Sequence, residues 1–137
     1  PPPPPPPPFF FSPHTRPPPM LRSLVGSEMC IRDRFVNKTF NPRIIKKMDD
    51  EEAIIYLSEL RQIGRWSAEM ILLFTYNRSN IWPVQDIGLL RAISNNYKKS
   101  YLPPMSFVNR LKTRFSPYCS VATWYLWRSI DDEPIQY

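Results

Sequence analysis

The chain has 137 residues, of which 42% are apolar, and a formal net charge of +6 at pH 7. That length predicts a single domain. No apolar run reaches the roughly 18 residues that a membrane-spanning helix needs, so we expect a cytoplasmic protein without a membrane partner. Of the two cysteines, only Cys119 lies in the part expected to fold, which excludes an internal disulfide and a cysteine-based zinc or iron–sulfur site there.

Residues 1–34 differ in composition from the rest of the chain. They hold twelve of the 18 prolines and show no helical or strand period, so we predict that they are disordered. A secretory signal is excluded, because the basic start, clean apolar stretch and cleavage site are missing. A PxxP ligand motif carries no information, because any run of eight prolines satisfies it. The stretch from Leu21 to Arg34 resembles a translated sequencing adapter, so we expect this segment to be artefactual.

Residues 35–137 carry 14 Lys and Arg against 10 Asp and Glu, a formal charge of +4. This balance suits a nucleic-acid partner without requiring one. A first helix is predicted to begin after the N-cap Asp49, because acidic residues fill its first turn and apolar residues recur at helical spacing as far as Leu60. A second helix, apolar nearly all round, is predicted from about Arg65 to Asn77.

Three further helices are predicted after a connector at 78–85. One begins near Asp86 with Ile87, Leu90 and Ile93 on one face, and another covers 106–115 between two proline-containing breaks. Ser120 is expected to cap the last, with Val121, Trp124, Leu126 and Trp127 mostly inward. No stretch alternates as a strand does. The fold class is therefore all-α, with five short helices and no internal repeat.

The informative stretch runs from Leu60 to Met70 and is followed by residues 82–88. A tight turn around Ile63 and Gly64 would join two helices into a helix-hairpin-helix. A glycine lets the backbone approach a phosphate closely, and the second helix offers free N–H groups to it. Such contacts position DNA without reading its sequence. The hairpin alone leaves open an ordinary helical hairpin whose glycine only ends a helix.

Asp86 follows Gly64 by 22 residues. Together these elements resemble the helix-hairpin-helix and the catalytic aspartate of the DNA glycosylase (HhH-GPD) superfamily, and they are most similar to the 3-methyladenine DNA glycosylase II type. The stretch 114–128 resembles the C-terminal helix of that family, and the whole resemblance covers Phe35 to about Tyr137. It implies a base-excision-repair enzyme that hydrolyses the N-glycosidic bond of alkylated bases, acting as a monomer on double-stranded DNA.

The resemblance also implies roles for individual residues. Asp86 would be the catalytic carboxylate that stabilises positive charge on the sugar, although an N-cap for the third helix is the alternative. Trp66 and Trp127 would line the pocket for a flipped base, with Met70 and Tyr125 as further candidates. For any single tryptophan the alternative is core packing, which we retain for Trp124. The DNA contacts would come from the hairpin residues Gln62, Ile63, Gly64, Arg65, Trp66 and Ser67.

Members of the superfamily that also nick the strand carry a lysine two residues after the hairpin glycine. Trp66 occupies that position here, and no lysine lies between Lys47 and Lys98, so a monofunctional enzyme is expected. The four-cysteine iron–sulfur loop of the endonuclease III type is also missing from this sequence. No cofactor is expected other than a structural Na⁺ or K⁺, which the family often holds among the hairpin carbonyls.

Two positions depart from the family pattern. Gln62 replaces the first glycine of the usual turn, where a left-handed conformation would cost energy. Cys119 stands where a basic residue is common, so one backbone contact to DNA would be lost. Only the later of the family's two helical lobes is identified, so we expect a truncated chain that lacks part of the pocket. The alternatives are a non-catalytic helix-hairpin-helix DNA-binding module, whose affinity would fall with salt, and an all-α interaction domain.

Overall fold

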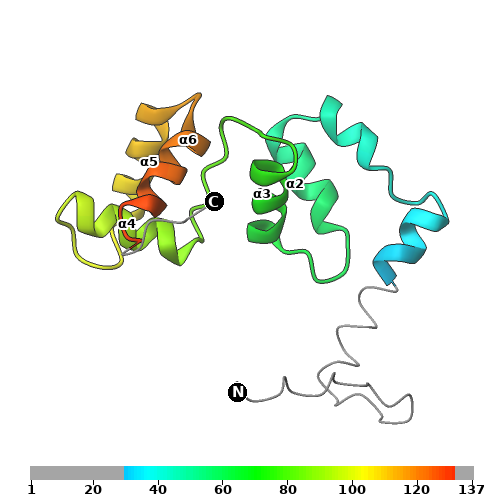
Figure 1. Ribbon diagram of the computed structural model, residues 1–137, viewed down its shortest axis with the longest axis horizontal. Helices are drawn as coiled ribbons and strands as arrows, with labels where there is room; N and C mark the ends of the chain where they lie inside the picture. The colour runs from blue at the N-terminus through cyan, green and yellow to red at the C-terminus, as the bar shows by residue number, and fades with distance from the viewer. Residues whose placement is uncertain (1–29, 132–137) are drawn as a thin grey trace, which may run out of the picture.

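The computed structural model describes residues 30–131, which contain helices and no strands. Residues 30–36 are helical and precede a 3-10 helix, η1 (Pro42–Lys47). Five α-helices follow: α2 (Asp50–Ser58), α3 (Arg65–Phe74), α4 (Ile87–Asn96), α5 (Met105–Phe115) and α6 (Cys119–Arg128) (Figure 1). The predicted all-α class and its five helices are confirmed. The disorder predicted for residues 1–29 lies outside the described residues.

The helices form two hydrophobic cores. One core joins η1, α2 and α3 through Ile45, Leu57 and Leu72, and we call this part the hairpin unit (residues 40–81). The other joins α4, α5 and α6 through Ile93 and Val108, and we call it the C-terminal unit (residues 82–130). The connector between α3 and α4 passes from one unit to the other, and Figure 1 shows the two units side by side.

The first described helix corrects one expectation from composition. Residues 30–34 were predicted to be disordered together with the proline-rich stretch, yet they are helical. The guanidinium of Arg34 donates a 2.6 Å hydrogen bond to the carbonyl of Glu59, at the end of α2. Next in the chain, the ring of Phe35 packs 4.9 Å from that of Phe40, which in turn stacks on Tyr56. The Arg34–Glu59 contact spans 25 residues, so composition did not indicate it.

Local capping explains where two of the helices begin. Asp49 caps α2 in a capping box, in which its carboxylate accepts from the Glu52 N–H and the Glu52 carboxylate accepts from the Asp49 N–H. Asp86 caps α4, because its Oδ2 accepts a 2.6 Å hydrogen bond from the Leu89 N–H. Both N-caps were predicted and are confirmed.

The predicted cap of the last helix was wrong. α6 begins at Cys119, and its N-cap position is Tyr118 rather than Ser120. The Ser120 hydroxyl instead donates to the carbonyl of Arg78 and accepts a 2.9 Å hydrogen bond from the Ile81 N–H. Ser120 therefore ties the start of α6 to the connector between the two units. A partner 39 residues away cannot be inferred from the local sequence.

Several apolar residues expected to face inward are exposed. Val121 and Trp124 on α6 are 49% and 37% exposed, and Ile87 at the start of α4 is 62% exposed. The core packing expected for Trp124 is therefore not found, because each short helix buries only the side that faces its own unit. Among the described residues, no helix is long and apolar enough to cross a membrane.

Candidate functional site

In the turn between α2 and α3, the residue with positive φ lies two residues before Gly64. Gln62 adopts the left-handed conformation, with φ 67°. Gly64 has φ −83° and ψ 176° and is the N-cap residue of α3. The interpretation of Gly64 as a residue that merely ends the preceding helix is therefore wrong. The energetic cost expected at Gln62 applies, because only glycine adopts this conformation without strain.

Nothing within the described residues requires a glycine at position 64. Its φ is ordinary, and a Cβ added there would meet no atom within 4 Å. α3 also has no side-chain cap, whereas α2 and α4 are each capped by an aspartate. The first turn of α3 therefore presents main-chain N–H groups and the positive end of the helix dipole at an unobstructed surface. An anionic group from outside the chain can approach this surface closely.

Arg65 is already paired within the chain. Its two terminal nitrogens donate hydrogen bonds of 2.6 and 2.8 Å to the carboxylate of Glu51, and its Nε donates one of 3.2 Å to Glu69. The hydrogen bonds from Arg65 hold the pKa of Glu51 below its ordinary value. All three guanidinium nitrogens are engaged in the hairpin unit, so its main-chain N–H is the part of Arg65 best placed to meet a phosphate.

The other hairpin residues divide between core and surface. Ile63 packs partly buried against the core of the hairpin unit. Gln62 and Gly64 are exposed, and Ser67 is partly buried in the first turn of α3. The exposed backbone of the turn thus lies beside the uncapped start of α3, and the packing of Ile63 against the core holds the turn in place.

Asp86 accepts hydrogen bonds from three donors that come from three helices. Trp66 on α3 donates its indole N–H to Oδ1 at 3.0 Å. Trp127 on α6 donates its indole N–H to Oδ2 at 2.7 Å, and the Leu89 N–H on α4 also donates to Oδ2, at 2.6 Å. The carboxylate is therefore fixed in orientation at the junction of the two units, and its capping and site-forming roles coexist.

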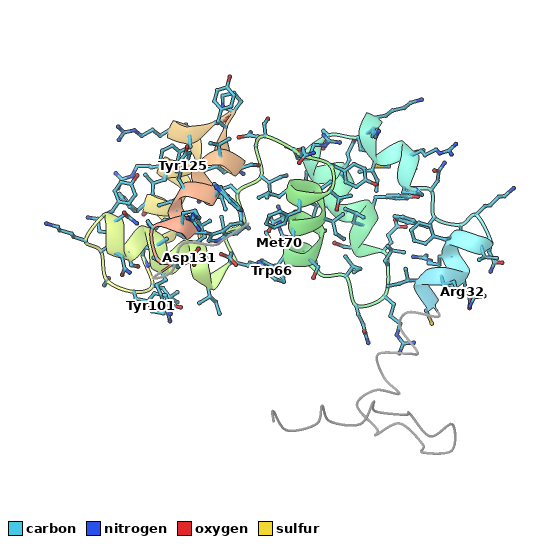
Figure 2. All side chains as sticks on the ribbon, viewed as in Figure 1. Arg32, Trp66, Met70, Tyr101, Tyr125 and Asp131 are labelled. Atoms are coloured by element: carbon cyan, nitrogen blue, oxygen red, sulfur yellow. The ribbon has the colours of Figure 1, made fainter. Side chains whose placement is uncertain are left out.

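Aromatic rings flank this carboxylate. Trp66 is 46% exposed, and Trp127 is partly buried. Phe74, at the end of α3 and 55% exposed, stacks on Trp127 with ring centroids 6.1 Å apart and an interplanar angle of 13°. Met70 lies one turn after Trp66 on α3 and is partly buried (Figure 2). The arrangement offers electron-rich ring surface next to a fixed negative charge, which suits a cationic or electron-poor planar ligand.

Gly88 is a site residue that the sequence analysis missed. A Cβ added to it would lie 3.1 Å from Asp86 Oδ2 and 3.4 Å from Cδ1 of Trp127. A side chain at position 88 would therefore require the Asp86 carboxylate to shift by a few tenths of an ångström, next to the indole of Trp127. A glycine two residues after a capping aspartate was the available signal, although it does not reveal which ring it accommodates.

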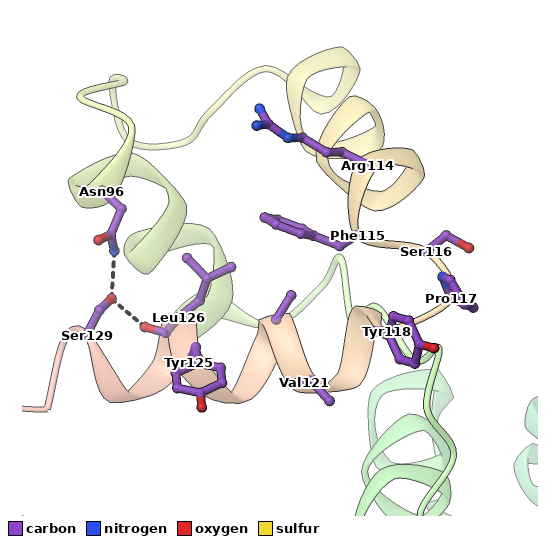
Figure 3. Close-up of a pocket in the computed structure, with 11 residues that line it drawn as sticks. Asn96, Arg114, Phe115, Ser116, Pro117, Tyr118, Val121, Tyr125, Leu126 and Ser129 are labelled. Carbon is purple, nitrogen blue, oxygen red and sulfur yellow. Dashed lines mark hydrogen bonds between the residues drawn. The ribbon is translucent and has the colours of Figure 1, made fainter.

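Tyr125 is not brought to this cluster. It lies two residues before Trp127 on α6, which places it about 200° around the helix from Trp127. Its side chain is 71% exposed and lines a cavity of about 580 Å³ that runs along α6 and is bordered by the C-terminal ends of α4 and α5 (Figure 3). The structure thus groups Asp86, Trp66 and Trp127 and leaves Tyr125 on another side.

A second carboxylate is buried close to the hairpin. Glu69 on α3 is 2% exposed, and its Oε1 accepts from Arg65, whereas its Oε2 has no hydrogen-bond partner among the described residues. Burial raises the pKa of Glu69, although Arg65 opposes the shift. Burial likewise raises the pKa of the Cys119 thiol, which is fully buried. Neither group is exposed to a ligand, so we assign them to structure.

The chain is similar in sequence to known proteins over part of its length. No protein-family model matches the chain. Over 84 residues, 61% of its length, the chain is 36% identical to “Putative DNA-3-methyladenine glycosylase YfjP” of Bacillus subtilis. Over the same length it is 29% identical to DNA-3-methyladenine glycosylase 1 of Schizosaccharomyces pombe.

A solved structure shows the same likeness. The 3-methyladenine DNA-glycosylase from Archaeoglobus fulgidus matches 61% of this chain with a TM-score of 0.52 and 30% sequence identity. The chain spans only part of these proteins: 29% of the Bacillus protein, 37% of the Schizosaccharomyces protein and 29% of the Archaeoglobus structure. Over the matched stretch, the chain is therefore a homologue of part of the helix-hairpin-helix 3-methyladenine DNA glycosylases.

Proposed function

We propose that this chain is part of a base-excision-repair glycosylase that hydrolyses the N-glycosidic bond of alkylated bases in double-stranded DNA. The observation that carries the proposal is the Asp86 carboxylate, held by the indole N–H groups of Trp66 and Trp127. The names of its relatives support the choice of substrate class. We further propose a cytoplasmic enzyme that acts as a monomer.

Asp86 would act on the sugar. Cleavage of a base–sugar bond builds positive charge at the anomeric carbon, and a fixed carboxylate facing that carbon stabilises the charge and orients the attacking water. Because its oxygens are held by Trp66, Trp127 and the Leu89 N–H, little reorientation is needed as the charge develops. The base must first be rotated out of the duplex.

The aromatic rings would receive the base. Many alkylated purines carry a positive charge, so they leave readily and are attracted to electron-rich ring faces. Trp66 and the stacked pair of Trp127 and Phe74 supply such faces beside Asp86, and Met70 adds a polarisable contact. A general acid strong enough to expel a neutral base is not needed for such substrates.

The hairpin would hold the DNA backbone. The uncapped start of α3 and the unobstructed backbone of Gly64 fit a phosphate, with main-chain donors from Gly64, Arg65, Trp66 and Ser67. We also propose a structural Na⁺ or K⁺ bound by the turn carbonyls. Main-chain oxygens are the ligands that we propose, and the described residues contain no group of three or more His, Cys, Asp or Glu side chains that could hold a metal ion. Tighter DNA binding in K⁺ or Na⁺ than in a bulky organic cation at equal ionic strength would support such a site.

The enzyme would be monofunctional. Trp66 occupies the position where a nicking enzyme would place its lysine, and its indole N–H is engaged by Asp86. No amine is therefore available there to form a Schiff base with the opened sugar.

The test is release of methylated bases from an alkylated duplex by the complete gene product that contains this chain. We expect the Asp86→Asn variant to lose at least about a hundredfold in release rate, because asparagine keeps the N-cap but removes the charge. Equal release by Asp86→Asn would refute the catalytic assignment. DNA affinity that falls with salt, without any release, would favour the non-catalytic binding module. Strand nicking without added alkali would refute the monofunctional assignment.

A further inference from the structure

Within residues 35–130, the net positive charge is confined to residues 87–130, the part of the C-terminal unit that follows Asp86. Residues 35–86 contain seven basic and seven acidic residues, so their formal charge is zero. Residues 87–130 contain seven basic residues and no acidic one, and the next acidic residues are Asp131, Asp132 and Glu133. The hairpin, where the phosphate contacts are proposed, thus belongs to the part of the chain that has no net charge.

Two arginines of the hairpin unit are neutralised by ion pairs within the chain. Arg65 pairs with Glu51 and Glu69, and Arg78 pairs with Asp50 at 3.2 Å. Within residues 30–131, by contrast, no basic residue of the C-terminal unit forms an ion pair. Of the two units, the C-terminal unit is therefore the one whose net positive charge attracts a polyanion over long range.

Four of these cations gather around the loop between α4 and α5. Arg91, Lys98, Lys99 and Arg110 are all exposed. With the rings of Tyr101 and Phe107 they form what we call the basic patch. Figure 1 shows this loop at the end of the C-terminal unit that lies away from the hairpin unit.

Aromatic rings organise the cations of the basic patch. The guanidinium of Arg91 lies 5.9 Å from the centre of the Tyr101 ring. Lys99 Nζ and the guanidinium of Arg110 lie 5.2 and 5.5 Å from the centre of the Phe107 ring. A cation resting on a ring keeps its hydrogen-bond donors free for an external acceptor while losing less side-chain freedom on binding. This arrangement indicates that the basic patch binds a ligand with several hydrogen-bond acceptors, rather than contacting water alone.

The backbone conformation of Lys98 also supports a ligand-binding role for the basic patch. Lys98 has φ 50°, directly after α4, where a glycine would adopt the left-handed conformation without strain. The following N–H, from Lys99, donates a 2.9 Å hydrogen bond to the carbonyl of Ser94, which holds the loop against α4. A lysine in place of the less strained glycine adds a cation to the patch.

We propose that the basic patch is a second DNA-binding surface, which contacts backbone phosphates and supplies most of the salt-dependent affinity. The identity of its ligand rests on the proposed function. α4 connects the two sites, because it begins beside Asp86 and ends at the patch. Its ten residues extend about 15 Å, which matches four to five base-pair steps of about 3.4 Å. A duplex held by the hairpin can therefore continue along α4 to the basic patch.

The experiment measures binding of the complete chain to an unmodified duplex at several salt concentrations. The triple variant Lys98→Gln, Lys99→Gln and Arg110→Gln removes three charges from the patch. The matched control, Lys38→Gln, Lys46→Gln and Lys47→Gln, removes three charges from exposed positions before α2. We expect the patch variant to weaken binding at least about tenfold and to reduce the slope of log affinity against log salt by about 2 to 3. The control should retain both the affinity and the slope, and circular dichroism checks that both variants fold.

The outcomes separate this proposal from the proposed function. Equal loss of affinity and slope in both triple variants overturns the patch, even where base release still depends on Asp86. Patch-specific loss supports it, even where Asp86→Asn releases bases as the unaltered protein does. Stronger patch-dependent binding to phosphatidylserine vesicles than to duplex DNA would overturn the assignment to DNA.

Discussion

The indole Nε1 of Trp127 donates a hydrogen bond of 2.7 Å to Oδ2 of Asp86, although 41 residues separate the two in the chain. This bond joins α6 to the first turn of α4 and places a ring beside the carboxylate. Trp66 completes the arrangement from α3. The orientation of the Asp86 carboxylate therefore depends on contacts from three helices, and a single substitution can remove one contact at a time.

Trp127→Phe removes the N–H donor and keeps an aromatic ring. We expect base release to slow at least about tenfold, because the hydrogen bond to a charged group is worth about 1.5–3 kcal/mol. Single-turnover kinetics on alkylated duplex measures this. Trp124→Phe is the matched control on the same helix, and it should release bases at the unaltered rate. Equal slowing in both variants would mean that α6 as a whole, rather than the bond to Asp86, is affected.

Gly88→Ala should separate activity from stability. The added Cβ would lie 3.1 Å from Asp86 Oδ2 and displaces the carboxylate or the Trp127 ring. Alanine also stabilises a helix interior by up to about 1 kcal/mol relative to glycine. We therefore expect base release to fall about tenfold or more while the melting temperature is kept or raised. Unchanged release would show that the contact between Trp127 and Asp86 tolerates a shift of a few tenths of an ångström.

Gly64→Ala should weaken DNA binding without unfolding the hairpin. No atom lies within 4 Å of the added Cβ and φ is ordinary, so we expect the free energy of unfolding to change by less than about 1 kcal/mol. The methyl group would instead obstruct an approaching phosphate and raise the dissociation constant for duplex DNA. Fluorescence anisotropy and thermal unfolding measure the two effects. An unaltered dissociation constant would place the phosphate elsewhere.

Gln62→Gly should stabilise the protein. Gln62 has φ 67°, and glycine removes the steric cost of that conformation, about 1–2 kcal/mol, at a smaller cost in unfolded-chain entropy. We expect a net gain of about 0.5–1 kcal/mol in the free energy of unfolding, measured by urea titration. Gln62→Ala keeps the strain and is the control. A gain in the alanine variant equal to that in the glycine variant would contradict this explanation.

Glu69→Gln should flatten the dependence of stability on pH. Burial raises the pKa of Glu69 above its ordinary value of 4.5, so between the two values the folded protein binds more protons than the unfolded chain. Stability contributed by this group is therefore lost as pH rises through that window. The free energy of unfolding of the Glu69→Gln variant should therefore fall less than that of the unaltered protein as the pH rises from about 4.5. Glu51→Gln serves as the contrast, because the lowered pKa of Glu51 gives stability that is lost as pH falls.

Much of the local structure was predictable because it depends on near neighbours. The Asp49 capping box closes over three residues, and so does the hydrogen bond by which Asp86 caps α4. Helical periodicity located the five α-helices for the same reason. The helix at residues 30–36 was missed, because Arg34 reaches Glu59 across 25 residues and a composition average hides such a contact.

Within the candidate site, the sequence by itself determined which residue types were available: a capping aspartate, a hairpin glycine, and a tryptophan where a lysine would be needed for lyase chemistry. Only the tertiary structure decided that both indoles meet on Asp86, that Gly88 lies against one of them, and that Arg65 is occupied by Glu51. The physical reason is range. Caps and helical periods are set within one turn. The Arg65–Glu51 pair spans 14 residues and forms when α2 packs on α3, and the two indole contacts to Asp86 span 20 and 41 residues and join helices of both units.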